Sequence, residues 1–108
     1  MDQITFDEFK KIDIRIGKII SAQRIEDSEK LLKLIVDFGQ EQRQIIAGIA
    51  KSYLPEHLEG KECPFVFNLQ SKYIKGLESQ GMVLCANNSG NPVLLHTDKE
   101  VEPGSLIK

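Results

Sequence analysis

The sequence lacks several features by which function is commonly recognised. It contains no tryptophan, two histidines and two cysteines among its 108 residues. There is no C-x-x-C pair and no Cys/His cluster, so a structural zinc site is not expected. A Walker A loop and a G-x-G-x-x-G fingerprint are also absent, which argues against the common phosphate-cradling and dinucleotide-binding loops.

Long apolar runs are missing as well. No stretch approaches the ~20 apolar residues that a membrane-spanning helix needs, and the first residues, MDQITFDEFKK, lack the apolar region of a signal peptide. We therefore expect a cytoplasmic protein with no membrane partner. Cys63 and Cys85 lie within apolar runs, which favours buried, reduced thiols over a disulfide.

No catalytic constellation is evident. The stretch GLESQG resembles a nucleophile elbow but has Leu77 where the G-x-S-x-G motif requires glycine. His57 and His96 are isolated, so surface or packing roles are favoured over those of a ligand or base. The carboxylates form no pair at a catalytic spacing. We predict a protein that is not an enzyme and has no metal site and no cofactor.

The remaining composition is that of one ordinary globular domain, 1–108, with 41% hydrophobic and 28% charged residues. Its 14 basic and 16 acidic residues give a net charge of −2, so bulk charge gives no support for nucleic-acid binding. The local charge of one segment differs from the net charge of the chain. Between Cys63 and Leu77 the only charged residues are Lys72 and Lys75. Basic groups segregated onto one surface would still bind a polyanion.

Alternating apolar residues predict strands at 12–22, 31–39 and 43–49. Gly17 interrupts the first, and we expect a bulge or bend there that lets one long strand join two sheets. The polar turn at 39–42 is short enough to make the second and third strands an antiparallel hairpin. Further strands are predicted in ECPFVFN, GMVLCAN and PVLLH.

Two short helices complete the pattern. Thr5 and Glu8 have the spacing of a capping box, which predicts a helix over Thr5 to Lys11. Phe6 and Phe9 share one of its faces, and we favour packing in the chain's own core over docking to a partner. The stretch PEHLEG predicts a second short helix after the third strand.

This order predicts an all-β fold, the OB-fold five-stranded Greek-key barrel, with a short helix between strands 3 and 4 and short N- and C-terminal additions. Another small barrel or a sandwich is the alternative. OB barrels bind ligands on the face of strands 2 and 3, between the loops joining strands 1–2 and 4–5. Those loops fall here at 24–30 and 68–80, and the second contains the isolated lysines.

Several residues near these loops suit RNA, and each also has an ordinary structural interpretation. Lysines and Arg43 would neutralise phosphates or simply be solvated. Tyr73 would stack on a base or pack beneath its loop. Asn68 and Ser79 would hydrogen-bond sugars or base edges, or satisfy loop backbone. Met82 alternates with Leu84, which favours the core.

A family resemblance rests on the segments DIRIGKI, EKLLKLIVDFG, RQIIAGIA, YLPEHLEGK, NLQSKYIKGLESQGMVL and VEPGSLI. Together they resemble stand-alone bacterial tRNA-binding proteins of the OB type, a domain also found at the C-terminus of methionyl-tRNA synthetases. The likeness covers about Phe9 to Ile107. It implies a non-catalytic homodimer that binds tRNA by its shape, with a synthetase as a possible further partner.

The resemblance also assigns residues. It places Lys30 in an acid-Lys-Leu motif, Ser79 and Met82 in a Ser-x-Gly-Met motif, and Asn68 at the end of strand 4. The preceding stretch, RIEDSEKLL, departs from the family because it lacks the usual proline and small residue. The complete set of predicted RNA-binding residues is Lys30, Lys33, Arg43, Asn68, Lys72, Lys75, Ser79 and Met82.

A second branch of the family contains secretion-related chaperones, which the C-terminal segment NPVLLHTDKEVEPGSLI also resembles. The alternative hypothesis is therefore a protein-binding module, either chaperone-like or a synthetase accessory. We place the expected dimer contacts in the N-terminal helix and the C-terminal tail, where apolar residues are otherwise unexplained.

Overall fold

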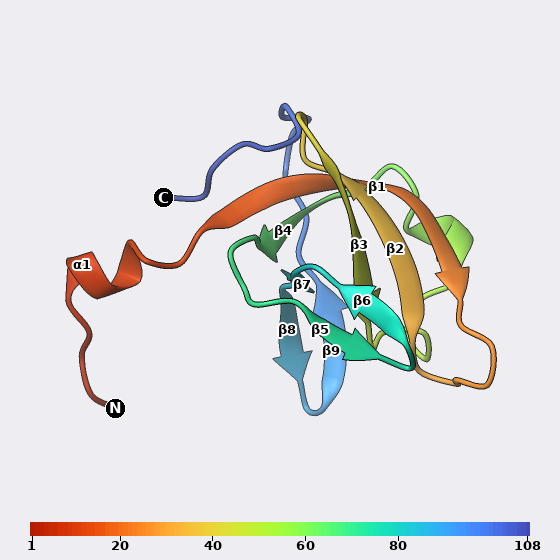
Figure 1. Ribbon diagram of the computed structural model, residues 1–108. Helices are drawn as coiled ribbons and strands as arrows, with labels where there is room; N and C mark the ends of the chain where they lie inside the picture. Colours follow the sequence, from red (N-terminus) through yellow and green to blue (C-terminus); the bar gives the residue numbers. More distant parts are fainter.

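The computed structural model describes residues 1–108 as a curled, antiparallel β structure with little helix (Figure 1). A five-stranded sheet has the order β3-β2-β1-β4-β7, and the two-stranded sheets β5-β6 and β8-β9 lie beside it. The helical elements are α1 (Phe6–Phe9) and the 3-10 turn η1 (Pro55–His57). The strands are β1 (Ile14–Arg24), β2 (Leu32–Asp37), β3 (Gln42–Ala47), β4 (Glu62–Val66), β5 (Lys72–Ile74), β6 (Leu77–Ser79), β7 (Met82–Val83), β8 (Cys85–Asn88) and β9 (Asn91–Leu94). The predicted all-β, OB-like fold is confirmed.

The long strand β1 joins two parts of the sheet. It pairs with β4 up to Lys18 and with β2 from Lys18 onward. The register shift falls at Ile20, so the bulge is not at Gly17 as predicted. Gly17 is needed for another reason, because a Cβ atom there would overlap a Val36 methyl and the Phe38 ring. Close packing against β2 therefore explains this glycine.

The core lies inside the curl of the sheet. Leu32, Leu34 and Val36 occupy alternate positions of β2 and are fully buried, as the predicted two-residue period requires. The rings of Phe38 and Phe65 meet edge to face with their centroids 5.4 Å apart. The predicted hairpin of the second and third strands is also confirmed, since β2 and β3 pair antiparallel over their whole lengths.

The segment 68–80, predicted to be a loop, contains the hairpin β5-β6. Its turn is formed by Lys75 and Gly76, with φ values of 54° and 77°. Two successive positive φ angles are typical of the type I′ turn that suits a tight β-hairpin. The predicted fifth strand is likewise divided into β7 and β8.

The N-terminal helix has its capping box but not its predicted length or packing. The Thr5 hydroxyl accepts the Glu8 N–H at 3.1 Å, and the Glu8 carboxylate accepts the Thr5 N–H at 2.9 Å. The helix ends at Phe9 instead of Lys11. Phe6 is 72% exposed and Phe9 38% exposed, so the prediction that they pack in the chain's own core is wrong. Figure 1 shows α1 standing clear of the barrel.

Candidate nucleic-acid interface

The β5-β6 hairpin is fastened across the edge strand β3 by side chains. Ser79 Oγ accepts the Ile46 N–H at 3.0 Å, and Gln80 Oε1 accepts the Gln44 N–H at 3.1 Å. The Gln44 side chain in turn donates to the Glu78 carbonyl at 2.9 Å. An unpaired strand edge would leave these N–H groups without partners, so the same contacts satisfy β3 and fix the hairpin.

The Ser-x-Gly-Met motif has a structural explanation at two of its positions. Ser79 is 5% exposed, and its hydroxyl, besides accepting from β3, donates to the Gly81 carbonyl at 3.1 Å. Gly81 has φ 151°, and a Cβ atom there would lie 2.9 Å from the Val66 carbonyl oxygen. Ser79 is therefore a buried residue that fixes the backbone around the site. Met82, by contrast, is 46% exposed and available to a ligand.

A groove of about 700 Å³ lies between this hairpin and β3. Its apolar part includes Met82, which the resemblance places at the groove floor, together with Leu69 and Ile74. Lys72 is exposed at the same groove. The complete lining consists of Ile46, Leu69, Gln70, Ser71, Lys72, Ile74, Ser79, Gly81 and Met82.

Of the predicted lysines, only Lys72 lines this groove, and the others lie on segments next to it. Lys33 of β2 is the register partner of Ile46, which lines the groove. Lys75, at the hairpin tip, donates through Nζ to the Asp27 carbonyl at 3.1 Å and so joins the tip to the 25–31 loop that carries Lys30. We call Lys30, Lys33, Lys72, Lys75 and Met82 the groove surface.

The charge of the groove surface is open to solvent and to ligands. The ammonium groups of Lys30, Lys33 and Lys72 make no hydrogen bond or ion pair within the chain. The 25–31 loop also carries three exposed acidic residues, Glu26, Asp27 and Glu29, so the surroundings of Lys30 are net acidic.

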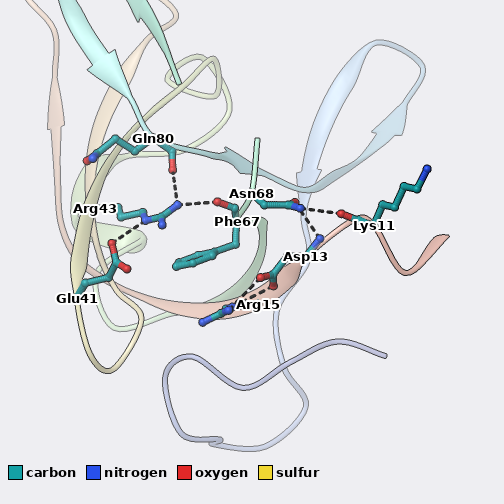
Figure 2. A network of polar contacts seen from close by, with 8 residues as sticks. All are labelled: Lys11, Asp13, Arg15, Glu41, Arg43, Phe67, Asn68 and Gln80. Atoms are coloured by element: carbon teal, nitrogen blue, oxygen red, sulfur yellow. Dashed lines mark hydrogen bonds and ion pairs between the residues drawn. The ribbon is translucent and has the colours of Figure 1, made fainter. Parts of the chain in front are cut away.

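Arg43, another predicted RNA contact, is engaged inside the chain (Figure 2). Its Nη1 donates to the Phe67 carbonyl at 2.6 Å and to the Gln80 carbonyl at 3.2 Å, while Nε pairs with Glu41 at 2.9 Å. Its guanidinium carbon lies 3.5 Å from the Phe67 ring centroid, and that of Arg15 lies 4.1 Å from the same centroid. Side-chain hydrogen bonding to Asp13 raises the pKa of Arg15.

Asn68 is also engaged internally, although its side chain is exposed. Its Oδ1 accepts the Asp13 N–H at 2.9 Å, and its Nδ2 donates to the Lys11 carbonyl at 2.7 Å (Figure 2). These partners are 55 and 57 residues away in sequence. Sequence spacing gave no sign of this bridge, which uses both polar atoms of the amide.

The titratable groups of the chain form no reactive cluster. Burial raises the pKa of Cys63 to about 12, and burial also raises the pKa of Cys85. Both are free thiols, as predicted, and thiols with raised pKa values are poor nucleophiles. No group of three or more His, Cys, Asp or Glu side chains is placed to hold a metal ion. None of the helices has the length and apolar character required to cross a membrane.

A second exposed surface is apolar and lies at the two chain ends. The C-terminal tail is attached along β1, where the Ile107 N–H donates to the Ile14 carbonyl at 2.9 Å. It lines a hollow of about 450 Å³ together with α1. We call the exposed apolar residues Phe6, Phe9, Ile12, Leu106 and Ile107 the arm surface.

Comparison with known proteins gives a consistent family. Residues 14–106 match the family model described as a putative tRNA-binding domain. The chain is 48% identical over 106 residues to a methionine–tRNA ligase of Archaeoglobus fulgidus, covering 98% of the chain but 16% of the ligase. The chain thus spans about one-sixth of the length of that relative.

Solved structures extend the comparison to the fold. A MetRS-related protein from Pyrococcus horikoshii matches with a TM-score of 0.96 and 42% identity, covering 100% of both chains. The chaperone CsaA of Bacillus anthracis matches with a TM-score of 0.89 and 30% identity, covering 99% of this chain and 100% of that one. The resemblance seen in the sequence is confirmed, and the chain belongs to the family of putative tRNA-binding domains.

Proposed function

We propose that residues 1–108 form a single, non-catalytic domain that binds tRNA as a homodimer in the cytoplasm. The observation that carries this proposal is a groove lined by the exposed Lys72 and Met82, in a chain whose net charge is −2. Further lysines lie on the adjoining hairpin tip (Lys75) and on β2 opposite the groove residue Ile46 (Lys33). Phosphate binding requires cations free to displace counterions, and the lysines at 30, 33 and 72 have no competing partner in the chain.

The groove surface suits the shape and backbone of folded RNA better than a base sequence. Lys72 and Lys33 would contact phosphates, which position a nucleic acid without reading it. The apolar Met82 and Leu69 offer no hydrogen bonds to discriminate bases, but they would accept the face of an unstacked base at the tRNA surface. Lys75 has a backbone contact to Asp27 that phosphate binding would replace or share.

The proposal assigns a supporting role to three of the predicted contacts. Ser79 is buried with its hydroxyl donor in use, and the guanidinium of Arg43 is held by two carbonyls and Glu41. Asn68 has both amide atoms engaged. We assign these three residues to shaping the site, and the groove surface to contacting RNA.

The arm surface supports the homodimer. Phe6 is 72% exposed and Leu106 is 58% exposed, and each lies beside the same apolar hollow. Apolar side chains concentrated in this way mark an interaction site. Pairing of two arm surfaces would place two groove surfaces in one dimer. The dimer would thereby compensate for the few lysines in each chain.

A synthetase partner is the second part of the proposal. The matched ligases carry this domain as a small share of their length, which is the arrangement expected of a module that holds tRNA for a separate catalytic unit. The homodimer would then act as an accessory that concentrates tRNA.

A gel-shift titration with total tRNA at two salt concentrations tests the proposal. We expect binding that weakens steeply with salt, because released counterions drive the association. Absence of a shift at the lower salt concentration would refute tRNA binding.

The competing function is binding of unfolded protein, and one observation favours it: the similarity to a protein named chaperone CsaA over nearly the whole chain. The apolar lining of the groove would suit side chains of an extended polypeptide. Competition distinguishes the two functions. Unlabelled tRNA should displace labelled tRNA, and an unfolded polypeptide should not; displacement by the polypeptide alone would favour the chaperone.

A further inference from the structure

The N-terminal arm has one hydrogen bond to the rest of the molecule. The hydrogen bonds of residues 1–12 otherwise stay within that segment, as in the turn from Thr5 to Ile12. The exception is the bond from Asn68 Nδ2 to the Lys11 carbonyl, at 2.7 Å. Because Asn68 also accepts the Asp13 N–H, its amide bridges the junction between the arm and β1.

The residue before Asn68, Phe67, is held in a stack of three side chains (Figure 2). The ring of Phe67 lies between two guanidinium groups, with Arg15 at 4.1 Å and Arg43 at 3.5 Å from the ring centroid. Two cations can share one ring because each has its own carboxylate. Arg15 pairs with Asp13 at 2.9 Å, and Arg43 pairs with Glu41 at 2.9 Å.

The same stack contacts the hairpin that carries the lysines. Arg43 donates to the carbonyls of both Phe67 and Gln80, which flank the segment 68–80. Gln80 in turn fastens the hairpin to β3 through the Gln44 N–H. A planar guanidinium donates in fixed directions, so one side chain sets both ends of this segment relative to each other.

We propose that Asn68, which follows Phe67 of the Arg15–Phe67–Arg43 stack, is a positioning residue that fixes the direction of the N-terminal arm relative to the β5-β6 hairpin. This inference rests on the proposed function, in which the arm joins two protomers and the hairpin meets tRNA. In the proposed dimer, a fixed arm direction would set the distance between the two groove surfaces. A fixed distance would favour a ligand whose shape spans it. Asn68 is exposed and therefore does not pack in the core.

The test measures the arm direction within one protomer by pulsed dipolar EPR. Spin labels are placed at Asp7→Cys on α1 and Tyr73→Cys on β5, in a Cys85→Ser background, and labelled chains are diluted with unlabelled protein. The remaining Cys63 is fully buried. We expect a narrow distance distribution in the parent, and a distribution at least about twofold broader with Asn68→Ala.

The matched control is Asn87→Ala. Asn87 is also an exposed asparagine, and its Oδ1 accepts the Gly90 N–H at 2.7 Å, but it lies in the β8-β9 turn. We expect no broadening for this control. A second variant, Arg43→Lys, keeps the charge but replaces the planar guanidinium that contacts both carbonyls through Nη1 and Glu41 through Nε, and we expect it to broaden the distribution as well. An unchanged distribution in Asn68→Ala overturns the inference.

The RNA readout separates this inference from the proposed function. With Asn68→Ala we expect several-fold weaker tRNA binding and an unchanged slope of log affinity against log salt, because the phosphate-binding lysines remain. Parent-like tRNA affinity in Asn68→Ala would overturn the claim that Asn68 sets the arrangement of the groove surfaces. The EPR distance is intramolecular, so it is measurable even if the parent fails to dimerise or to bind tRNA; those failures would refute the proposed function alone.

Discussion

The groove surface and the arm surface are both exposed, but they are held in opposite ways. The hairpin of the groove is tied to β3 by several side-chain hydrogen bonds, including those of Ser79 and Gln80. The arm makes one hydrogen bond to the barrel, through the amide of Asn68. Its apolar side chains, such as that of Phe6, are exposed and do not pack in the core.

This difference indicates what each surface requires. A hairpin fixed by internal contacts presents its lysines in a set arrangement and needs no partner to fold. An arm that exposes phenylalanines gains stability only when another apolar surface covers it. The first surface is therefore fixed within one chain, whereas the second is left uncovered, and we propose that a second chain covers it. Four predictions test this contrast.

The largest effect is expected at the arm. Phe6→Ala removes one phenylalanine from each protomer, and burial of such a side chain stabilises by about 1.5–3 kcal/mol. Two copies per dimer should raise the dissociation constant at least about 100-fold. Sedimentation equilibrium measures it. Val93→Ala is the control, since Val93 is 41% exposed on β9 and should leave the constant unchanged. A dimer unaffected by Phe6→Ala would exclude the arm as the interface.

The next effect concerns the fastening of the hairpin. Ser79→Ala leaves the Ile46 N–H and the Gly81 carbonyl without their hydroxyl partner. A buried polar group without a partner costs about 1–3 kcal/mol, so the free energy of unfolding in urea should fall by that amount. Ser71→Ala, at an exposed position in the same segment, should change it by less than about 0.5 kcal/mol. Equal stabilities would show that β3 does not depend on this hydroxyl.

A smaller effect is expected at the lysines of the groove. Combined Lys72→Gln and Lys75→Gln should flatten the slope of log affinity for tRNA against log salt by about 1 per lysine or somewhat less. The matched control is Lys61→Gln with Lys99→Gln, two lysines that line a separate polar depression near His96. Equal flattening in both double variants would point to general charge attraction and not to this groove.

The last prediction concerns the pH dependence of stability, which appears only at alkaline pH. Burial raises the pKa of Cys63 from about 9 to about 12 on folding, so the folded state favours the neutral thiol. The resulting stabilisation is complete below pH 9 and is lost as the pH rises toward 12. Urea unfolding at pH 8 to 11 should show a steeper decline for the parent than for Cys63→Ala. If the free energy of unfolding falls equally with pH in both proteins, the Cys63 thiol does not contribute to the pH dependence.

Much of the fold was predictable because the relevant signals are local. The alternation from Leu32 to Phe38 is a repeated period-two pattern, and the structure buries that face. The spacing of Thr5 and Glu8 likewise specifies its own hydrogen bonds. By contrast, the β5-β6 turn was missed because Lys75 occupies a position where Asn or Asp usually marks a type I′ turn.

The site was predictable only in part, for a related reason. Residue type alone identified Lys72, which the structure places at the groove. Residue type does not reveal which polar groups are already used. Arg43 and Asn68 looked like ligand contacts, and their partners up to 57 residues away became known only from the fold. Exposure of Phe6 was missed because an amphipathic turn looks the same whether its cover is the same chain or another.

The long sequence separation between the arm and Asn68 has a consequence for biosynthesis. The exposed phenylalanines of the arm are synthesised well before Asn68, the residue proposed to orient the arm. Asn68 lies 55 residues after Asp13, whose N–H it accepts. If the arm pairs two chains as proposed, productive pairing has to wait until the segment after β4 has been made and folded. Before that point, the proposed bridge at Asn68 cannot orient the arm.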